Sequence, residues 1–500
     1  MIGSGSLKIG ALSMADLLPK ATFHGASDIW FTSCCSDASS CRRGDVFVAV
    51  IDVDGDGHES ISRAVKRGVT GIITERLVPN CEVPVCIVPD TRIALGEISH
   101  ALAGFPSRRI NVVGVTGTHG KTTTTCLIKS VFKAAGLESG IMNTMGYCDG
   151  QRTSPAAITT PPAPILANYL ARMRDNGCTH GIVEMSSESL AQHQTSGIEL
   201  DVACVTNVHS GHLDYHGNAQ NYREAKWRML EQLRTQGLAV LNADDDVCCE
   251  FLDQFAGPAL TIAMQRPAEL TGTVMERLPS EQTFLLQCGS DSIPVRTHII
   301  GDHHVYNCLT AAAVGLAYRI DLPTIVRGLE VVDQLPGRLQ RIECGQPFNV
   351  FVDDARTPEA LEISLRTLRE ITQGRLICVF GAKGERDRQQ RPLMGQAIAK
   401  MADLTVLTED SPRHEDSAAI VEQVLQGMRD APEVIVELDR ACAIDTALSV
   451  AEAGDCVLIT GRGHQTHQLI GRQQVYFDDR EVASMLLRGP GFDVDIRRAA

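Results

Sequence analysis

Residues 114–125, Gly-Val-Thr-Gly-Thr-His-Gly-Lys-Thr-Thr-Thr-Thr, constrain the fold more than any other stretch of the chain. The apolar run Asn111–Thr116 predicts a buried strand, which leads through a turn containing Gly117 and Gly120 into a helix that begins at Lys121. Backbone N–H groups in such a turn can converge on an anion, and the helix N-terminus adds its dipole. The pattern predicts a phosphate cradle within an α/β domain.

The first helical residues supply the groups that a nucleotide needs. Lys121 can reach terminal phosphates and the Thr122 hydroxyl can bind Mg²⁺, so ATP is the expected nucleotide. A strict phosphate loop would have glycine where this chain has Val115. An ordinary glycine turn between a strand and a helix therefore stays the alternative.

Size and charge restrict the class of protein. A chain of 500 residues predicts about three domains, and 44% hydrophobic with 21% charged residues is typical of a globular protein. The net charge of −15 disfavours nonspecific binding to nucleic acids or anionic membranes. The seventeen cysteines include no Cys-x-x-Cys pair, which favours reduced thiols. Without an apolar signal core or a run of eighteen apolar residues, we expect a cytoplasmic protein.

The order of apolar runs predicts three α/β domains, at residues 1–107, 108–336 and 337–500, with Leu335-Pro336-Gly337 as the linker. In the first domain we expect an exposed loop at 36–58 around one strand. The predicted strands are 46–51, 71–74 and 85–88 in the first domain, 111–116, 181–185, 204–207 and 238–242 in the second, and 348–352, 376–380, 404–408, 434–437 and 456–460 in the third; the named helices are 60–67 and 219–235. The second domain should contain a buried parallel sheet and the third a doubly wound, Rossmann-like one.

Polar residues at predicted strand ends suggest a metal site. Glu184 closes one strand and is a hard oxygen ligand suited to Mg²⁺ beside a phosphate loop, although an isolated glutamate there is more often solvated. The loop at 206–216 contains His209, His212, Asp214 and His216. Their spacing differs from that of a zinc hydrolase, which leaves that chemistry a weak alternative.

Taken in order, the motifs of this chain resemble those of the Mur ligases, the ATP-dependent amide-forming enzymes of peptidoglycan precursor synthesis, and most closely the branch that adds the third peptide residue. The resemblance covers nearly the whole chain. It is carried by residues 40–49, 56–58, 117–123, 143–146, 159–161, 184–187, 206–216, 225–226, 306–307, 336–338, 352–353, 357–361, 384–387, 391–395, 410–413 and 461–464.

The resemblance implies an ADP-forming acid–amino-acid ligase whose substrates are ATP, UDP-N-acetylmuramoyl-L-Ala-D-Glu and an amino acid, expected to be meso-2,6-diaminopimelate. It implies catalytic roles for Lys121, Glu184, His212 and Lys226, and two Mg²⁺ ions held by Thr122, Glu184, His212 and a carbamylated Lys226. From the pattern alone, Lys226 is an ordinary surface lysine on an amphipathic helix.

Further contacts follow from the same resemblance. ATP is expected to contact Gly117, Thr118, Gly120, Lys121, Thr122, Thr123, Asn307, Arg338 and Asp353. The UDP-sugar-peptide is expected to contact Ser40, Asn143, Thr144, Thr159, Thr160 and Ser186, with its uridine end on the first domain. The amino acid is expected to contact Arg386, Asp410, Ser411, Arg413, Gly461 and Gln465. A monomer with no nucleic-acid partner and no membrane insertion is the expected state.

Five positions depart from the family pattern. Ser411 and Gln465 replace an asparagine and a glutamate of the motifs that select diaminopimelate, and Gln465 retains only an uncharged acceptor for the distal ammonium. Glu188 replaces a histidine, and Asp354 and Arg356 replace a tyrosine and a histidine. These changes leave open a related ligase with another amino acid, or a nucleotide-binding copy with weakened catalysis. A folylpolyglutamate- or cyanophycin-type ligase is a further alternative.

Overall fold

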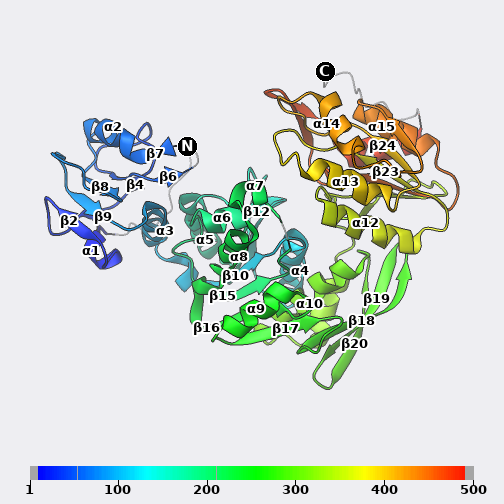
Figure 1. The fold of residues 1–500 in the computed structure, drawn as a ribbon. Coiled ribbons are helices and arrows are strands. Elements are labelled where there is room, and N and C mark those ends of the chain that lie inside the picture. Colours follow the sequence, from blue (N-terminus) through cyan, green and yellow to red (C-terminus); the bar gives the residue numbers. More distant parts are fainter. Residues whose placement is uncertain (1–9, 53–54, 210, 490–500) are drawn as a thin grey trace. The chain divides into compact units, whose positions relative to one another are not determined.

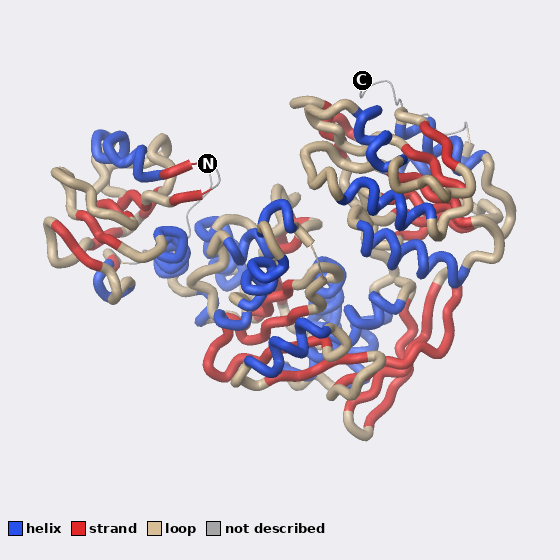
Figure 2. The backbone as a smooth tube through the Cα atoms, viewed as in Figure 1, coloured by secondary structure: helices blue, strands red, loops and turns tan. Residues whose placement is uncertain are grey.

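The computed structural model describes residues 10–52, 55–209 and 211–489. The chain divides into two compact units: residues 1–262 with 313–320, and residues 263–312 with 321–500. Figure 1 and Figure 2 show strands alternating with helices in both. The predicted α/β class is confirmed, whereas the boundaries proposed at residues 107 and 336 stay a prediction.

A five-stranded sheet lies near the start of the first unit. Its strand order is β2-β9-β8-β5-β4, and strands β5 and β8 are buried along their whole length. The strands are β2 (Thr22–His24), β4 (Cys34–Cys35), β5 (Val46–Val48), β8 (Gly71–Thr74) and β9 (Val85–Ile87), with helices α2 (Ile61–Lys66) and α3 (Thr91–Leu102). The strand predicted at 46–51 ends at Val48, and β6 (Ile51–Asp52) instead pairs with β7 (Gly55–Asp56).

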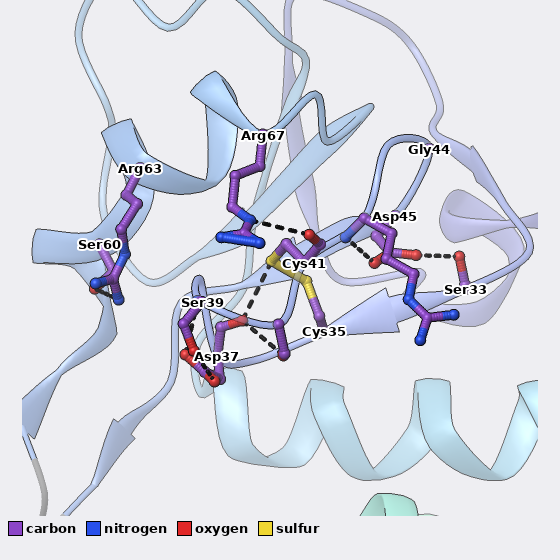
Figure 3. Close-up of a disulfide and its surroundings, with 12 residues drawn as sticks. Ser33, Cys35, Asp37, Ser39, Cys41, Gly44, Asp45, Ser60, Arg63 and Arg67 are labelled. Atoms are coloured by element: carbon purple, nitrogen blue, oxygen red, sulfur yellow. Dashed lines mark hydrogen bonds between the residues drawn. A yellow bond between two sulfur atoms is a disulfide. The ribbon is translucent and has the colours of Figure 1, made fainter.

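A disulfide joins Cys35, just before the predicted exposed loop, to Cys41 within it. Cys35 and Cys41, whose Cα atoms lie 5.6 Å apart, enclose a short turn that contains Ser40. Figure 3 shows the pair beside Asp37, with Arg67 Nε donating a hydrogen bond to the Cys41 carbonyl at 3.1 Å. The prediction of reduced thiols is wrong for this pair, because proximity in the fold depends on the turn and not on a recognisable cysteine spacing.

The main sheet of the first unit contains a parallel core in the order β11-β14-β10-β15-β16-β17, continued at one edge by the antiparallel strands β12 and β13. Its strands are β10 (Asn111–Thr116), β11 (Ser139–Asn143), β12 (Gly146–Cys148), β13 (Thr153–Ser154), β14 (His180–Glu184), β15 (Leu200–Val205), β16 (Leu233–Asn242) and β17 (Ala259–Ala263). The helices are α4 (Lys121–Ala134), α5 (Ala163–Asp175), α6 (Ser187–Ala191), α7 (Leu213–His216), α8 (Ala219–Trp227) and α9 (Asp246–Gln254). Val115 pairs with Glu184 on one side and Cys204 on the other, so these three strands end together.

The second unit contains the doubly wound sheet predicted for the end of the chain. Its order is β21-β22-β26-β23-β24-β25, parallel from β22 to β25. The strands are β21 (Gln340–Arg341), β22 (Asn349–Val352), β23 (Leu376–Phe380), β24 (Leu404–Leu407), β25 (Val434–Val436) and β26 (Cys456–Thr460). Helices α12 (Pro358–Ile371), α13 (Gln390–Ala399), α14 (Ser417–Leu425), α15 (Arg440–Ser449) and α16 (Asp479–Arg488) accompany them. Alternate strand residues enter two separate cores, Phe351 on one face and Val350 with Val352 on the other.

Other parts of the predicted secondary structure also need correction. The helix predicted at 219–235 ends at Trp227, and the strand predicted at 238–242 begins at Leu233, because Leu233 pairs with Leu200 of β15. The sequence reading also missed an antiparallel meander in the second unit. It consists of β18 (Leu270–Leu278), β19 (Glu281–Cys288) and β20 (Asp291–Thr297), followed by α10 (Asp302–Ala317) and α11 (Leu322–Glu330).

Candidate active site

The predicted phosphate cradle is a tight turn between β10 and α4. Gly117 has a φ of +150°, and a Cβ atom there would overlap the Thr206 hydroxyl. Two backbone N–H groups of the turn are held by Asn207: Thr118 N donates to its carbonyl and His119 N to its side-chain oxygen, each at 2.9 Å. The residues that follow β15 therefore fix the shape of the turn, and glycine is the residue that fits at 117.

Lys121 begins α4 directly after Gly120, which has a left-handed φ of +82°. Its Nζ atom donates to the carbonyls of Gly117 at 2.9 Å and Thr118 at 3.1 Å. The ammonium is thus folded back over the turn. At this position the Lys121 ammonium can contact phosphate oxygens that bind at the N-terminus of α4.

A buried carboxylate stands beside this turn. Glu184, 1% exposed, ends the strand next to β10, and the Thr122 hydroxyl lies 3.0 Å from both of its oxygens. Thr144 adds a backbone N–H at 2.9 Å and a hydroxyl at 3.1 Å. The alternative of a solvated Glu184 is excluded. The structure thereby brings together two of the predicted metal ligands and one residue predicted to contact the UDP-sugar-peptide.

Other residues predicted to contact the UDP-sugar-peptide continue from Glu184. The Thr159 hydroxyl lies 3.0 Å from that of Thr144, while Thr160 donates to the Glu184 carbonyl at 2.8 Å and accepts from Ser186 N at 3.0 Å. Asn143 is buried at the end of β11. Ser40 lies in the disulfide-closed turn, where its hydroxyl donates to the Asp37 carbonyl.

His212 makes an ion pair that the sequence reading did not predict. Its Nδ1 atom lies 2.8 Å from Glu188 Oε1, and both side chains are partly exposed. Burial raises the pKa of Glu188, but the hydrogen bond and charge of His212, with the nearby Lys121 ammonium, lower it further, so the pKa lies well below its usual range. Glu188 thus adds a fixed negative charge close to the predicted phosphate and metal ligands.

Lys226 on α8 is 1% exposed, so the reading as a surface lysine is wrong. Its Nζ atom lies 4.6 Å from the ring centre of Tyr222. Burial, assisted by repulsion from Lys121, lowers the pKa of Lys226 well below its ordinary value. Since the neutral amine is the nucleophilic form of lysine, this environment favours modification at Nζ.

The second unit gathers the remaining predicted residues at the carboxyl ends of its parallel strands. After β22, Asp353 accepts from Leu339 N at 3.0 Å, and Asp354 pairs with Arg338 at 2.8 Å and Arg356 at 3.4 Å. Burial raises the pKa of Asp354, but the two guanidinium groups outweigh it and hold the pKa at about 2. Two of the residues that depart from the family pattern thus form one charged cluster with Arg338.

The residues predicted to bind the amino acid follow β23, β24 and β26. Asp410 pairs with buried Arg462 at 3.0 Å, and Gln465 accepts from Lys383 Nζ at 2.8 Å. Arg413 contacts Glu385 at 3.3 Å. The remaining predicted residues are Ser411, 3.4 Å from Arg462, the left-handed Gly461 and the exposed Arg386.

Sequence reasoning missed Lys383 and Arg462 as members of this group. The available signal was their position, since each follows a buried apolar strand and lies next to a glycine. Gly337 of the predicted linker also packs here: with a φ of +61°, it lies so close to Gly463 and His464 that a Cβ atom would overlap their backbone. Asn307 is buried on α10 in the same unit. The assignment of these residues to nucleotide or amino acid stays a prediction.

The donor groups beside the glycine turn fit Mg²⁺. Among the described residues no group of three or more His, Cys, Asp or Glu side chains could hold a metal. Magnesium is commonly bound by one or two carboxylates with phosphate and water completing the shell, and Glu184 with the Thr122 hydroxyl provides such hard oxygen ligands. Among the residues that the structure describes, no helix is both apolar enough and long enough to span a membrane.

Comparison with known proteins agrees with this fold. Residues 115–315 match the Mur ligase middle domain, and residues 337–463 match the Mur ligase glutamate ligase domain. The UDP-N-acetylmuramoyl-L-alanyl-D-glutamate–2,6-diaminopimelate ligase of Geobacillus thermodenitrificans is 38% identical over 454 residues, which cover 89% of this chain and 93% of that protein. The UDP-N-acetylmuramyl-tripeptide synthetase of a Roseiflexus species is 36% identical, over 91% and 94%.

Solved structures give the same result. A UDP-N-acetylmuramoyl-L-alanyl-D-glutamate–2,6-diaminopimelate ligase superposes with a TM-score of 0.68 at 28% identity, over 95% of this chain and 99% of that one. A folylpolyglutamate synthase of Mycobacterium tuberculosis, at 20% identity and a TM-score of 0.61 over 74% and 92%, shares the fold.

The parallel sheet with its strand, glycine turn and lysine-led helix defines an α/β protein of the nucleotide-binding type. The chain belongs to the Mur ligases, a family of ATP-dependent ligases, and the resemblance seen in the sequence is confirmed.

Proposed function

We propose that this chain is the ADP-forming ligase that joins meso-2,6-diaminopimelate to UDP-N-acetylmuramoyl-L-Ala-D-Glu. The observation that carries the proposal is the buried Glu184 carboxylate, which meets the Thr122 hydroxyl beside the lysine-bearing glycine turn. The similarity to diaminopimelate ligases along nine-tenths of the chain supports the choice of substrates.

The reaction requires activation because a carboxylate resists attack by an amine. In the proposed sequence an oxygen of the substrate carboxylate attacks the γ-phosphorus of ATP and ADP leaves. The amine nitrogen then attacks the acyl carbon, loses a proton, and phosphate leaves from a tetrahedral intermediate. Neither transfer needs a nucleophile from the protein, so the contribution of the protein is positioning and electrostatic stabilisation.

Each proposed role follows from a group described above. Lys121 and the N-terminal end of α4 hold the phosphates and offset their charge. Glu184 and Thr122 would hold one Mg²⁺, and His212 with a carbamate on Lys226 a second; bound Mg²⁺ supplies further positive charge on the phosphoryl oxygens. Thr144, Thr159, Thr160 and Ser186 orient the UDP-sugar-peptide beside Glu184.

The test is mass spectrometry of the product. Purified protein is incubated with ATP, Mg²⁺, bicarbonate and UDP-N-acetylmuramoyl-dipeptide, and separately with diaminopimelate, lysine and ornithine. We expect a UDP-tripeptide containing diaminopimelate, with ADP and phosphate formed in equal amounts. Absence of phosphate release above background with every amino acid would contradict the proposal.

The role of Lys226 makes a separate prediction. Lys226→Ala removes the amine that would carry the carbamate, so we expect about a 100-fold or larger loss of kcat, partly restored by added acetate, because a free carboxylate can occupy the vacated space. Steady-state rates with and without acetate measure the effect. Lys133→Ala, at an exposed position of α4, is the control and should respond to neither change. Unchanged activity of Lys226→Ala would remove this residue from the site.

A further inference from the structure

We propose that Lys383 determines amino-acid specificity: its ammonium occupies the acceptor expected to receive the distal ammonium of the incoming amino acid. The ligase therefore selects an amino acid by its distal carboxylate and not by a distal amine. This inference rests on the proposed function, and it defines the substrate class as α-amino acids that carry a second carboxylate at the far end.

The strand order places Lys383 among the predicted amino-acid ligands. β23 pairs with β26 on one side and β24 on the other, so the loops that follow all three strands lie next to one another. These loops contribute Lys383, Gln465 and Asp410 respectively. Ligands of doubly wound sheets bind outside the carboxyl ends of the strands, which is the edge where these three residues meet.

Lys383 donates a hydrogen bond to one of the two acceptors found here and lies near the other. Its Nζ atom donates to Gln465 Oε1 at 2.8 Å and lies 4.0 Å from Asp410 Oδ2. Among the described residues Asp410 Oδ2 has no hydrogen-bond partner, while Oδ1 accepts from Arg462 at 3.0 Å. The Asp410 side chain is fully buried, and that of Lys383 is 14% exposed. A resident cation thus already stands between the two groups that could attract a cationic substrate.

A second ammonium at this position would meet repulsion instead of an acceptor. Besides Asp410, the charges that act on Lys383 include those of Asp354, Arg356 and Arg462, so cationic groups already lie close to the anionic ones. A carboxylate is favoured by the same arrangement. Arg413, partly exposed at this edge and only 3.3 Å from Glu385 through one nitrogen, has further donors to offer.

The experiment compares three amino acids with the unmodified protein. meso-Diaminopimelate carries both distal groups, 2-aminopimelate lacks the distal amine, and L-lysine lacks the distal carboxylate. We expect kcat/KM for 2-aminopimelate to be within about threefold of that for diaminopimelate, because the distal amine that it lacks has no acceptor here. We expect kcat/KM for lysine to be lower by about 100-fold, because the distal carboxylate that would pair with Arg413 is missing.

Variants separate the role of Lys383 from a structural one. Lys383→Met releases Gln465, so diaminopimelate should become preferred over 2-aminopimelate by about tenfold, and Lys383→Met with Gln465→Glu should increase that preference further. Lys383→Arg, which keeps the cation, should retain the original ratio. Lys400→Met, at an exposed lysine of the same unit paired with Glu362 at 3.7 Å, is the matched control.

Gln465→Ala tests the inference while keeping the Lys383 ammonium in place of a substrate ammonium. The ratio of diaminopimelate to 2-aminopimelate should stay unchanged, because Gln465 contacts Lys383 and not the substrate. A selective loss of diaminopimelate use in this variant, or a preference of more than about tenfold for diaminopimelate in the unmodified protein, would overturn the inference while leaving the ligase assignment intact. Failure to form product with any amino acid would instead overturn the proposed function.

Discussion

Lys121→Ala is expected to lower kcat by about a thousandfold or more and to weaken ATP binding. The Lys121 ammonium lies over the glycine turn, 2.9 Å from the Gly117 carbonyl, where it can offset phosphate charge during transfer. Removing it leaves the helix dipole and backbone donors to act alone. Product formation measured by mass spectrometry gives kcat, and calorimetric titration with a non-hydrolysable ATP analogue gives the affinity.

Lys133→Ala on the same helix is the control for this experiment. It changes the total charge by the same amount at an exposed position, so both constants should remain within about twofold. If Lys121→Ala turned over at the rate of the control, the glycine turn would not be the phosphate site. Circular dichroism of both variants establishes that the fold is retained.

Asp479→Ala is expected to destabilise the second unit by about 3–5 kcal/mol. Asp479 accepts from Arg440 through two hydrogen bonds of 2.7 Å and lies 3.7 Å from Arg462 Nε, and all three side chains are fully buried. Without the carboxylate, the buried Arg440 guanidinium loses both of these charge-assisted hydrogen bonds, and Arg462 keeps its ion pair with Asp410 alone. Urea unfolding followed by near-UV circular dichroism of the full chain measures the shift.

The matched control for Asp479→Ala is Glu362→Ala. Glu362 and Lys400 form an exposed ion pair at 3.7 Å in the same unit, so its loss should change stability by less than about 1 kcal/mol. Equal effects of the two substitutions would mean that the buried Asp479 ion pair contributes no more to stability than an exposed one.

The sequence predicted the buried strands well because their pattern is local. β8, β10, β23 and β26 were predicted with their bounds, since each is an apolar, largely β-branched run followed by polar or glycine residues. Within the site, the proximity of Glu184 and Thr122 could also be anticipated, because Glu184 ends one strand and Thr122 follows another, and both strands were expected in one parallel sheet.

Other features depend on contacts between distant segments. The apolar residues of 228–235 continue a helical pattern, and only pairing with β15 makes Leu233 the start of a strand. His212, which pairs with Glu188, has a left-handed backbone conformation. The sequence contains no signal that predicts this conformation at a histidine. The contact between Lys383 and Gln465 follows from β26 lying between β22 and β23, an order that no local motif reveals.

The close packing of Gly337 on Gly463 has a mechanical consequence. The backbones of Gly337 and Gly463 lie against each other with no side chain between them, so no flexible group can absorb a shift of either loop. A displacement of the segment carrying Arg338 must therefore push on the turn that presents Gln465. We expect the segment around Gly337 and the turn at residues 463–465 to shift together as one rigid body.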